Sequence, residues 1–151
     1  MLTELLPPER IRVPLGSHSR HALLHELVEM ALPDAGLATT EAVFQSVLSR
    51  EALMSTAMGE GLGVPHGRTK AVEAPVMAAG IVGAMDDYCA PDGTPVRACF
   101  LLVTPLSDGG AHLKVLGRLA RLVRRDDLRM ALYGAADAAS FAAVLRRAEA
   151  S

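Results

Sequence analysis

Histidine is the residue type in this sequence best suited to chemistry near neutral pH, because an unperturbed imidazole titrates at about pH 6.5. Of the five histidines, His66 has the most unusual surroundings, the segment Gly61-Leu-Gly-Val-Pro-His-Gly-Arg68. Its glycines remove side-chain bulk, and Pro65 restricts the backbone immediately before the histidine. The segment predicts an imidazole presented to an incoming group. A loop histidine that only bonds its own backbone is the alternative.

Three further histidines lie in or beside a predicted first helix. His21 and His25 stand four residues apart and therefore share one helix face, as a zinc site requires. No HExxH motif, HxxEH motif or cysteine pair accompanies them to complete a ligand set. We therefore predict no metal and no cofactor, and expect His18, His21 and His25 to be exposed polar side chains. A zinc protein built on this cluster is the alternative.

Hydrophobic spacing and breaking residues predict the elements that position these histidines. In chain order, the predicted elements are a short edge strand at 11–13, helices at 20–31 and about 39–53, strands at 76–85 and 96–104, a helix at 112–125, a short helix capped at 126 or 127, and a final helix capped at 137. Both strands are apolar throughout, which is typical of strands covered on two faces. The segment 55–67, which contains His66, is too rich in glycine for a helix.

Capping and turn residues set the expected boundaries of these elements. Ser17 or Ser19 precedes the first helix and Thr39 or Thr40 the second, as N-cap residues do. Asp92-Gly93 is a turn signal between the two apolar strands. The residues of the helix at 112–125 that we expect on its core side are Leu113, Leu116, Leu119, Ala120 and Val123.

The composition indicates one ordinary folded domain. A chain of 151 residues can bury about 70% of its unfolded surface around a single core. Hydrophobic residues make up 50% and charged residues 21% of the chain, which excludes a disordered or collagen-like protein. The formal net charge of −2, the absence of Trp and an aromatic content of 3% disfavour a nucleic-acid partner, which needs basic and stacking side chains.

Targeting and cysteine signals are consistent with a cytoplasmic protein. The N-terminal Met1-Leu-Thr-Glu-Leu-Leu-Pro-Pro8 has an early acid and a proline pair, unlike a signal peptide. Charges, prolines or glycines interrupt each apolar run well before about 18 residues, so we expect no membrane insertion. Cys89 and Cys99 lack CxxC spacing and form no disulfide framework.

Helical and strand patterns follow one another without an internal repeat or a linker-like break. We therefore predict the α/β fold class for residues 1–151: a single-domain sandwich with a mixed central β-sheet flanked by helices on both faces.

Five segments together resemble a known protein family in their order and spacing. They are Arg50-Glu-Ala-Leu-Met-Ser-Thr56, Gly59-Glu-Gly-Leu-Gly-Val-Pro-His-Gly67, Asp92-Gly-Thr-Pro-Val96, Phe100-Leu-Leu-Val-Thr-Pro105 and His112-Leu-Lys-Val-Leu-Gly-Arg-Leu-Ala120. This chain resembles the enzyme IIA domains of the bacterial phosphotransferase system, in the fructose, mannitol and nitrogen-regulatory branch. The resemblance covers nearly the whole chain and implies one enzyme IIA-like (type 2) domain over residues 1–151 with a mixed sheet flanked by helices.

The resemblance also implies a function and its residues. His66 matches the histidine that accepts phosphoryl, His112 matches a second histidine that stabilises the phosphoryl group, and Arg50 matches an arginine that contacts phosphoryl or partner. The implied donor is an HPr-type phosphocarrier protein. The implied acceptor is an enzyme IIB in sugar uptake; alternatively, the chain is a nitrogen-branch regulatory protein whose phosphorylation state controls binding to a target protein.

These residue types suit phosphoryl transfer, which requires positioning and compensation of oxygen charge. A neutral nitrogen of His66 can attack a phosphohistidine, and the resemblance implies that Nε2 is this nitrogen. His112 would lie in the first turn of its helix, where free N–H groups favour an anion. Arg50 offers a planar fork to phosphoryl oxygens. The alternatives are a capping histidine and a surface ion-pair arginine.

A few residues depart from the family pattern or leave their role open. Val64 and Gly63 replace the more usual Ile or Leu and Ala before Pro-His. Glu60 stands where a neutral polar residue is frequent, and a nearby acid repels an incoming phosphoryl group unless it points away or is paired. Arg68 is expected either to contact phosphate or partner, or to be solvated.

Overall fold

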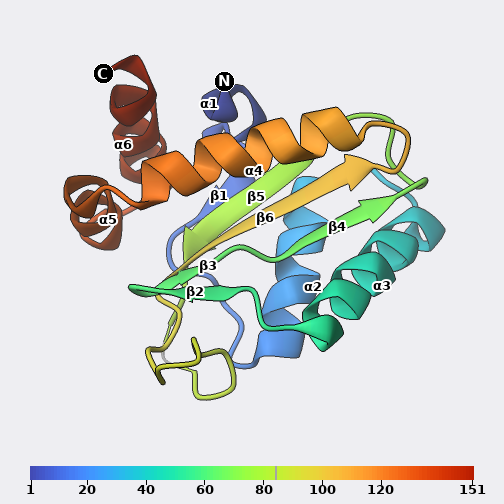
Figure 1. Ribbon diagram of the computed structural model, residues 1–151, viewed down its shortest axis with the longest axis horizontal. Helices are drawn as coiled ribbons and strands as arrows, with labels where there is room; N and C mark the ends of the chain where they lie inside the picture. Colours follow the sequence, from blue (N-terminus) through green and yellow to red (C-terminus); the bar gives the residue numbers. More distant parts are fainter. Residues whose placement is uncertain (84) are drawn as a thin grey trace.

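The computed structural model describes residues 1–83 and 85–151, in which a six-stranded sheet lies between two groups of helices (Figure 1). The strands are β1 (Ile11–Arg12), β2 (Ala57–Gly59), β3 (Leu62–Gly63), β4 (His66–Thr69), β5 (Val76–Ile81) and β6 (Ala98–Pro105). The helices are α1 (Leu2–Leu5), the 3-10 helix η1 (Pro8–Arg10), α2 (Arg20–Ala31), α3 (Leu37–Leu53), α4 (Gly109–Val123), α5 (Asp126–Tyr133) and α6 (Ala138–Ala150).

The sheet is mixed, as predicted. Its strand order is β1-β5-β6-β3-β2, with β4 also pairing with β6. β5 runs antiparallel to β6, whereas β3 and β4 both run parallel to β6 and follow each other along it. β6 is therefore the central strand with which the segment around His66 pairs.

Helices cover both faces of the sheet, because successive residues of β6 point to opposite sides. Cys99, Leu101 and Val103 pack with the buried residues of α2 and α3. Phe100 and Leu102 pack with those of α1, α4, α5 and α6. All eight residues of β6 are buried, so its apolar run is explained by this two-sided packing. The predicted α/β sandwich is confirmed.

Several predicted boundaries are confirmed. α2 spans the predicted 20–31, and the Ser19 hydroxyl accepts a hydrogen bond from the Ala22 N–H. The Asp137 carboxylate caps α6 by accepting from the Ser140 N–H. Gly93 adopts a φ of 86°, the left-handed conformation that a turn glycine provides.

Other boundaries were predicted wrongly, mostly at helix starts. α3 begins at Leu37 after Gly36, so Thr39 and Thr40 lie within its first turn and do not cap it. α4 begins at Gly109 and not at His112, since Asp108 caps it by accepting from the Ala111 N–H. These starts were missed because glycines, poor helix formers, occupy the cap or first turn.

The ends of the two long strands and the cap of α5 also differ from prediction. The strand predicted at 76–85 ends at Ile81, and its residue 84 lies outside the described residues. The strand predicted at 96–104 runs from Ala98 to Pro105. α5 has Arg125 at its N-cap position with no side-chain cap bond, so neither Asp126 nor Asp127 caps it. α1 and η1 were not predicted, being one turn or less in length.

The orientation of α4 differs from prediction at one residue that bears on function. Leu113 was predicted on the core side but is 72% exposed. His112, Leu119 and Val123 are the buried residues of α4 and follow the i, i+7, i+11 spacing of one helix face. His112, and not Leu113, therefore lies on the buried face of α4.

No helix within the described part of the chain is both long and apolar enough to cross a membrane.

Candidate functional site

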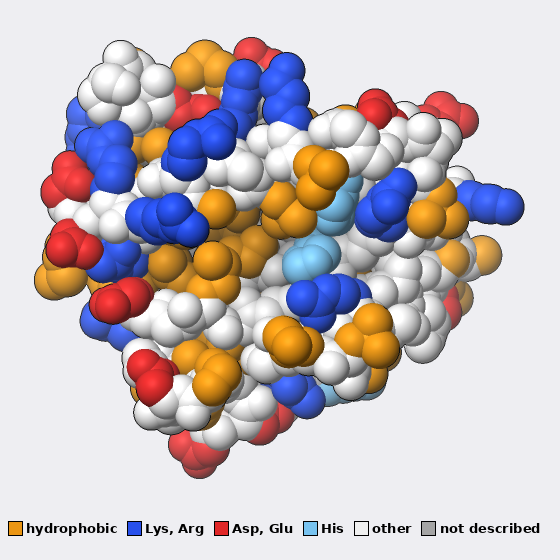
Figure 2. All heavy atoms as spheres, in the orientation of Figure 1, with side chains coloured by type: hydrophobic (Ala, Val, Ile, Leu, Met, Phe, Trp, Pro, Cys, Tyr) orange, Lys and Arg blue, Asp and Glu red, His pale blue; other side chains and the backbone are white. Residues whose placement is uncertain are grey.

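Two of the predicted site residues meet on the surface formed by β4 and the start of α4. His66 is the first residue of β4, and His112 lies in the first turns of α4. Their ring centroids are 5.6 Å apart, and the rings are inclined by 53°. Figure 2 shows two neighbouring histidine side chains near the middle of this face, bordered by hydrophobic and basic side chains, with acidic side chains toward its margins.

A break in the strand pairing determines how His66 is held. β3 and β4 both pair with β6, but Val64 between them bonds to Thr56 and not to β6, whereas the Pro65 carbonyl still accepts from the Leu102 N–H of β6. The Val64 carbonyl is therefore free to lie 2.9 Å from Nδ1 of His66. A carbonyl only accepts hydrogen bonds, so the proton of the neutral ring resides on Nδ1. The Nε2 atom of His66 then carries the lone pair.

Close packing of α3 behind the site depends on Gly67. A Cβ at this position would lie 2.7 Å from Oγ of Ser46 and 3.2 Å from the backbone nitrogen of Val47. Because both atoms belong to α3, a larger residue here would push that helix away from β4. The glycine after His66 is thus explained by helix–strand packing.

His112 is held by a threonine that the sequence analysis did not single out. Oγ1 of Thr104 on β6 lies 2.6 Å from Nδ1 of His112, and both side chains are buried. Since Nδ1 is engaged in this bond, Nε2 is the nitrogen of His112 left for another partner. A hydroxyl near the end of an otherwise apolar strand was the available signal in the sequence.

The surroundings of His112 favour its neutral form. Burial lowers the pKa of His112 below its usual value, and the nearby His66 and Arg68 lower it further. Both causes act in the same direction because each disfavours a positive charge on the ring. His112 is therefore a neutral imidazole at pH 7 unless an anion arrives beside it.

Two arginines on the elements next to the histidines bond to backbone carbonyls, and of these Arg68 acts electrostatically on His112. Arg50, half-buried near the end of α3, donates from Nη1 to the Met54 carbonyl at 2.8 Å. Arg68 on β4 donates from Nη2 to the Leu106 carbonyl at 2.9 Å. Within the described residues, Arg50 makes no hydrogen bond to His66 or His112, so its predicted contact with a phosphoryl group remains a prediction.

An apolar cavity adjoins His66. Its volume is about 230 Å³, and its other lining residues are Thr56, Met58, Val64, Leu116, Leu119 and Ala120. Large hydrophobic side chains are also exposed nearby. Met58, which lines this cavity, is 53% exposed, and Leu113, directly after His112, is 72% exposed. His66 thus borders an apolar cavity with exposed hydrophobic side chains nearby.

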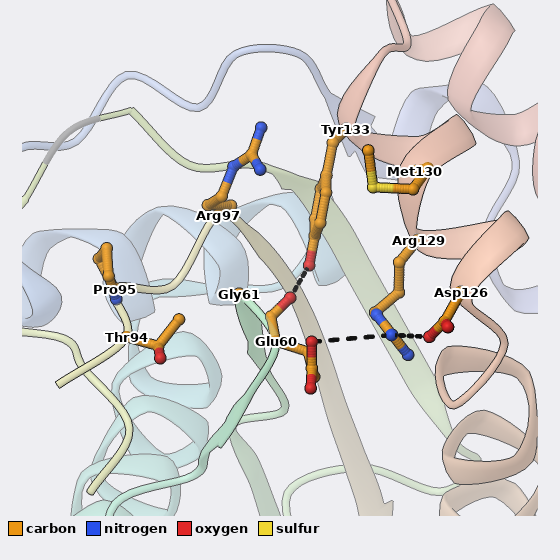
Figure 3. Close-up of a pocket in the computed structure, with 9 residues that line it drawn as sticks. All are labelled: Glu60, Gly61, Thr94, Pro95, Arg97, Asp126, Arg129, Met130 and Tyr133. Atoms are coloured by element: carbon orange, nitrogen blue, oxygen red, sulfur yellow. Dashed lines mark hydrogen bonds and ion pairs between the residues drawn. The ribbon is translucent and has the colours of Figure 1, made fainter. Parts of the chain in front are cut away.

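The carboxylate of Glu60 is paired away from the histidines. Glu60 lines a separate cleft of about 520 Å³ between the β2–β3 turn and α5, to which neither histidine contributes (Figure 3). Its carboxylate lies 3.8 Å from Nη2 of Arg129, and its carbonyl accepts a hydrogen bond from the Tyr133 hydroxyl. Arg129 also bonds more closely to Asp126, so the expected repulsion is weakened chiefly because the Glu60 carboxylate points into this separate cleft.

The histidines of the first helix are held by other contacts. His21 and His25 lie edge-on to Phe44, at centroid distances of 5.1 and 4.9 Å. His25 also pairs with Glu29 at 2.8 Å. Across residues 1–83 and 85–151, no group of three or more His, Cys, Asp or Glu side chains is arranged to hold a metal ion.

The arrangement around His66 suits attack on an electron-poor atom bound to oxygens. It combines an unprotonated imidazole nitrogen, a second neutral imidazole within 5.6 Å and two guanidinium groups on adjoining segments. Phosphoryl transfer requires these elements and little else from a protein.

Comparison with known proteins agrees with this chemistry. The family model described as "Phosphoenolpyruvate-dependent sugar phosphotransferase system, EIIA 2" matches residues 4–148. A nitrogen regulatory protein of Bradyrhizobium diazoefficiens is 37% identical over 147 residues, which make up 95% of this chain and 94% of that protein.

Solved structures agree as well. The crystal structure of nitrogen regulatory protein IIA-Ntr from Neisseria meningitidis matches with a TM-score of 0.84 at 31% identity and covers 95% of this chain and 98% of that chain. The complex of enzyme IIAMTL and phosphorylated enzyme IIBMTL from Escherichia coli matches in fold, with a TM-score of 0.73 at 17% identity over 94% of this chain and 97% of that chain. The chain belongs to the EIIA 2 family of the phosphoenolpyruvate-dependent sugar phosphotransferase system.

Proposed function

We propose that residues 1–151 act as one phosphocarrier domain in which His66 accepts a phosphoryl group from an HPr-type protein. The observation that carries the proposal is the hydrogen bond of 2.9 Å between Nδ1 of His66 and the Val64 carbonyl. It leaves Nε2 as the nucleophile. The adjoining His112 and the family membership of the chain support the same function.

The transfer balances when the donor is a protonated phosphohistidine. The Nε2 lone pair of His66 forms the new N–P bond, and the donor N–P bond breaks with its electron pair going to the donor nitrogen. The donor ring leaves as neutral imidazole. His66 keeps its Nδ1 proton and becomes a phosphoimidazolium, whose N–H the Val64 carbonyl accepts.

His112 and the flanking arginines compensate the phosphoryl charge in this proposal. With Nδ1 bonded to Thr104, His112 turns Nε2 toward the group on His66 and donates to a phosphoryl oxygen once protonated there. Arg50 and Arg68 supply positive charge from two sides, for phosphoryl or for the partner.

Two acceptors are compatible with such a carrier. The likeness to nitrogen regulatory proteins, 37% identical over 95% of this chain in one case, favours a regulatory output. The added phosphoryl charge would then change the binding of a target protein at the apolar surface around His66. The second candidate is transfer to an enzyme IIB in sugar uptake, supported by the fold shared with an enzyme IIA solved together with its IIB.

The carrier function is tested by incubating the protein with phosphoenolpyruvate, enzyme I and HPr and measuring its intact mass. The expected result is one acid-labile phosphoryl group on the original protein and on a His21→Ala control, and none on His66→Ala. Equal phosphorylation of the His66→Ala variant would contradict the proposal.

The acceptor is tested by adding an enzyme IIB domain to the purified phosphoprotein. A regulatory protein retains its phosphoryl group, whereas a sugar-uptake component loses it to IIB.

A further inference from the structure

A buried carboxylate outside the histidine pair connects to His66 through hydrogen bonds. Glu51, on the last turn of α3, is only 6% exposed. One of its oxygens accepts from the Thr56 N–H at 2.9 Å, and the other accepts from the Thr56 hydroxyl at 2.5 Å. Both carboxylate oxygens thus hold one residue of the segment that leads to His66.

The hydroxyl of Tyr88 makes a further hydrogen bond to Thr56. It lies 2.6 Å from Oγ1 of Thr56. Because the Thr56 proton goes to the carboxylate, Tyr88 is the donor in this bond. Burial raises the pKa of Tyr88, so its hydroxyl keeps the proton it donates. A Cβ at Gly63 would lie 2.7 Å from this same hydroxyl, which explains the glycine at this position.

Thr56 in turn fixes the backbone that bonds His66. The Thr56 carbonyl accepts from the Val64 N–H at 3.0 Å. The carbonyl of the same Val64 is the group that accepts from Nδ1 of His66. A continuous path of hydrogen bonds therefore runs from the Glu51 carboxylate through Thr56 and Val64 to the imidazole.

Burying the Glu51 carboxylate costs free energy, which indicates that Glu51 does more than close a loop. A buried carboxylate is destabilising unless its oxygens are well bonded, and its nearest cation, Arg20, lies 4.0 Å away. Glutamine has the same shape but presents a donor where Glu51 has its second acceptor. The N–H and the hydroxyl of Thr56 bond to different carboxylate oxygens of Glu51, so glutamine, with a single oxygen, cannot accept both bonds in this geometry.

We propose that Glu51 is a positioning residue for His66: through Thr56 it holds the Val64 carbonyl where it keeps the Nδ1 proton and leaves Nε2 free. The catalytic consequence of this role rests on the proposed phosphocarrier function. The structural consequence, one fixed tautomer of His66, exists in the unphosphorylated protein.

The test compares Glu51→Gln with Glu26→Gln by ¹⁵N NMR of the histidine rings. Glu26 is a matched control, since its carboxylate also accepts from backbone N–H groups, a hydroxyl and an arginine, all within residues 12–17. We expect His66 to be the Nδ1–H tautomer in the original protein and in Glu26→Gln, and a mixture of tautomers in Glu51→Gln. Phosphorylation by HPr should slow roughly 10- to 150-fold in Glu51→Gln alone, as the loss of a hydrogen bond to a charged group predicts.

A pair of variants at Thr56 keeps the proposal testable if Glu51→Gln does not fold. Thr56→Ser retains the hydroxyl and should keep both the tautomer and the rate, whereas Thr56→Val removes it and should change both. The proposal is overturned if folded Glu51→Gln keeps one tautomer and the original rate, or if Glu26→Gln shows the same changes. A tautomer change in a protein that HPr does not phosphorylate would support the positioning role and contradict only the carrier function.

Discussion

At the scale of single residues, the two histidines differ in what fixes them. The Nδ1 atom of His66 is bonded to a backbone carbonyl and that of His112 to a threonine hydroxyl. The acceptor of the first bond is backbone, whose position we assign to Glu51 and Thr56, and the acceptor or donor in the second is the Thr104 side chain. Both imidazoles were predicted from the sequence through its resemblance to a family, but the groups that orient them were not.

The pH dependence of stability should reveal the environment of His112. Its folded pKa lies below the ordinary value of 6.5, so the unfolded chain binds the proton more tightly. The stabilisation from keeping this ring neutral is complete above pH 6.5 and is lost as pH falls through the folded pKa. Urea unfolding at several pH values should therefore show a smaller stability loss between pH 7.5 and pH 5.5 for His112→Gln than for the original protein. Equal losses would contradict this account.

Removing the hydroxyl of Thr104 should loosen His112. Thr104→Val has nearly the same shape but leaves Nδ1 of a buried imidazole without its partner. We expect a loss of about 1–3 kcal/mol in the free energy of unfolding. Thr104→Ser, which retains the hydroxyl, is the control, and a Thr104→Val variant as stable as the original would count against the bond. Unfolding in urea followed by circular dichroism measures both.

At the scale of elements, α4 places His112 through the cap at its start. Asp108 accepts a hydrogen bond from the Ala111 N–H directly before the histidine. Asp137 makes the equivalent bond at the start of α6. The two caps are alike in chemistry but only one belongs to the helix of the proposed site.

The two matched caps allow the effect of α4 on the position of His112 to be separated from its effect on the stability of the fold. Asp108→Ala and Asp137→Ala should each lower the free energy of unfolding by about 1 kcal/mol, as the loss of an N-cap does. Only Asp108→Ala should also slow phosphorylation by HPr, because it frees the turn that holds His112. If Asp137→Ala slows phosphorylation equally, general destabilisation is responsible and the cap of α4 has no special part.

The elements that the sequence could predict are those with many residues of consistent spacing. α2, β6 and α6 each have buried residues along several helical turns or along a whole strand, and the predicted helices and strand are confirmed. β2 and β3 have three and two residues, too few for a period, and exist because they pair with each other and with β6. The pairing with β6 is a tertiary effect. The Glu51–Thr56 bonding joins residues only five apart, but it lies where α3 ends and no periodic pattern indicates it.

At the scale of the whole molecule, two cores on opposite faces of one sheet leave the histidines at a surface. The sheet buries its apolar residues against α2 and α3 on one side and α1, α4, α5 and α6 on the other. The exposed Leu113 and Met58 are not needed by either core. If the proposed function holds, they are available to contact the phosphoryl donor.

The docking surface is tested by Leu113→Gln. Because this side chain is 72% exposed, the substitution should change the free energy of unfolding by less than about 0.5 kcal/mol. The rate of phosphorylation at low HPr concentration should nevertheless fall roughly 5- to 30-fold, since a buried leucine contact of about 1–2 kcal/mol is lost in the complex. Leu37→Gln, at a leucine of α3 that is 87% exposed, serves as the control. Equal rates for the two variants would argue against this surface.

The nitrogen that carries the phosphoryl group tests the account most directly. The phosphoprotein, labelled with ¹⁵N in its histidines, should show phosphorus–nitrogen coupling at Nε2 of His66 and a proton retained on Nδ1. This result follows from the Val64 carbonyl at 2.9 Å, which occupies Nδ1 before the donor arrives. Coupling at Nδ1 of His66, or at either nitrogen of His112, would contradict the account.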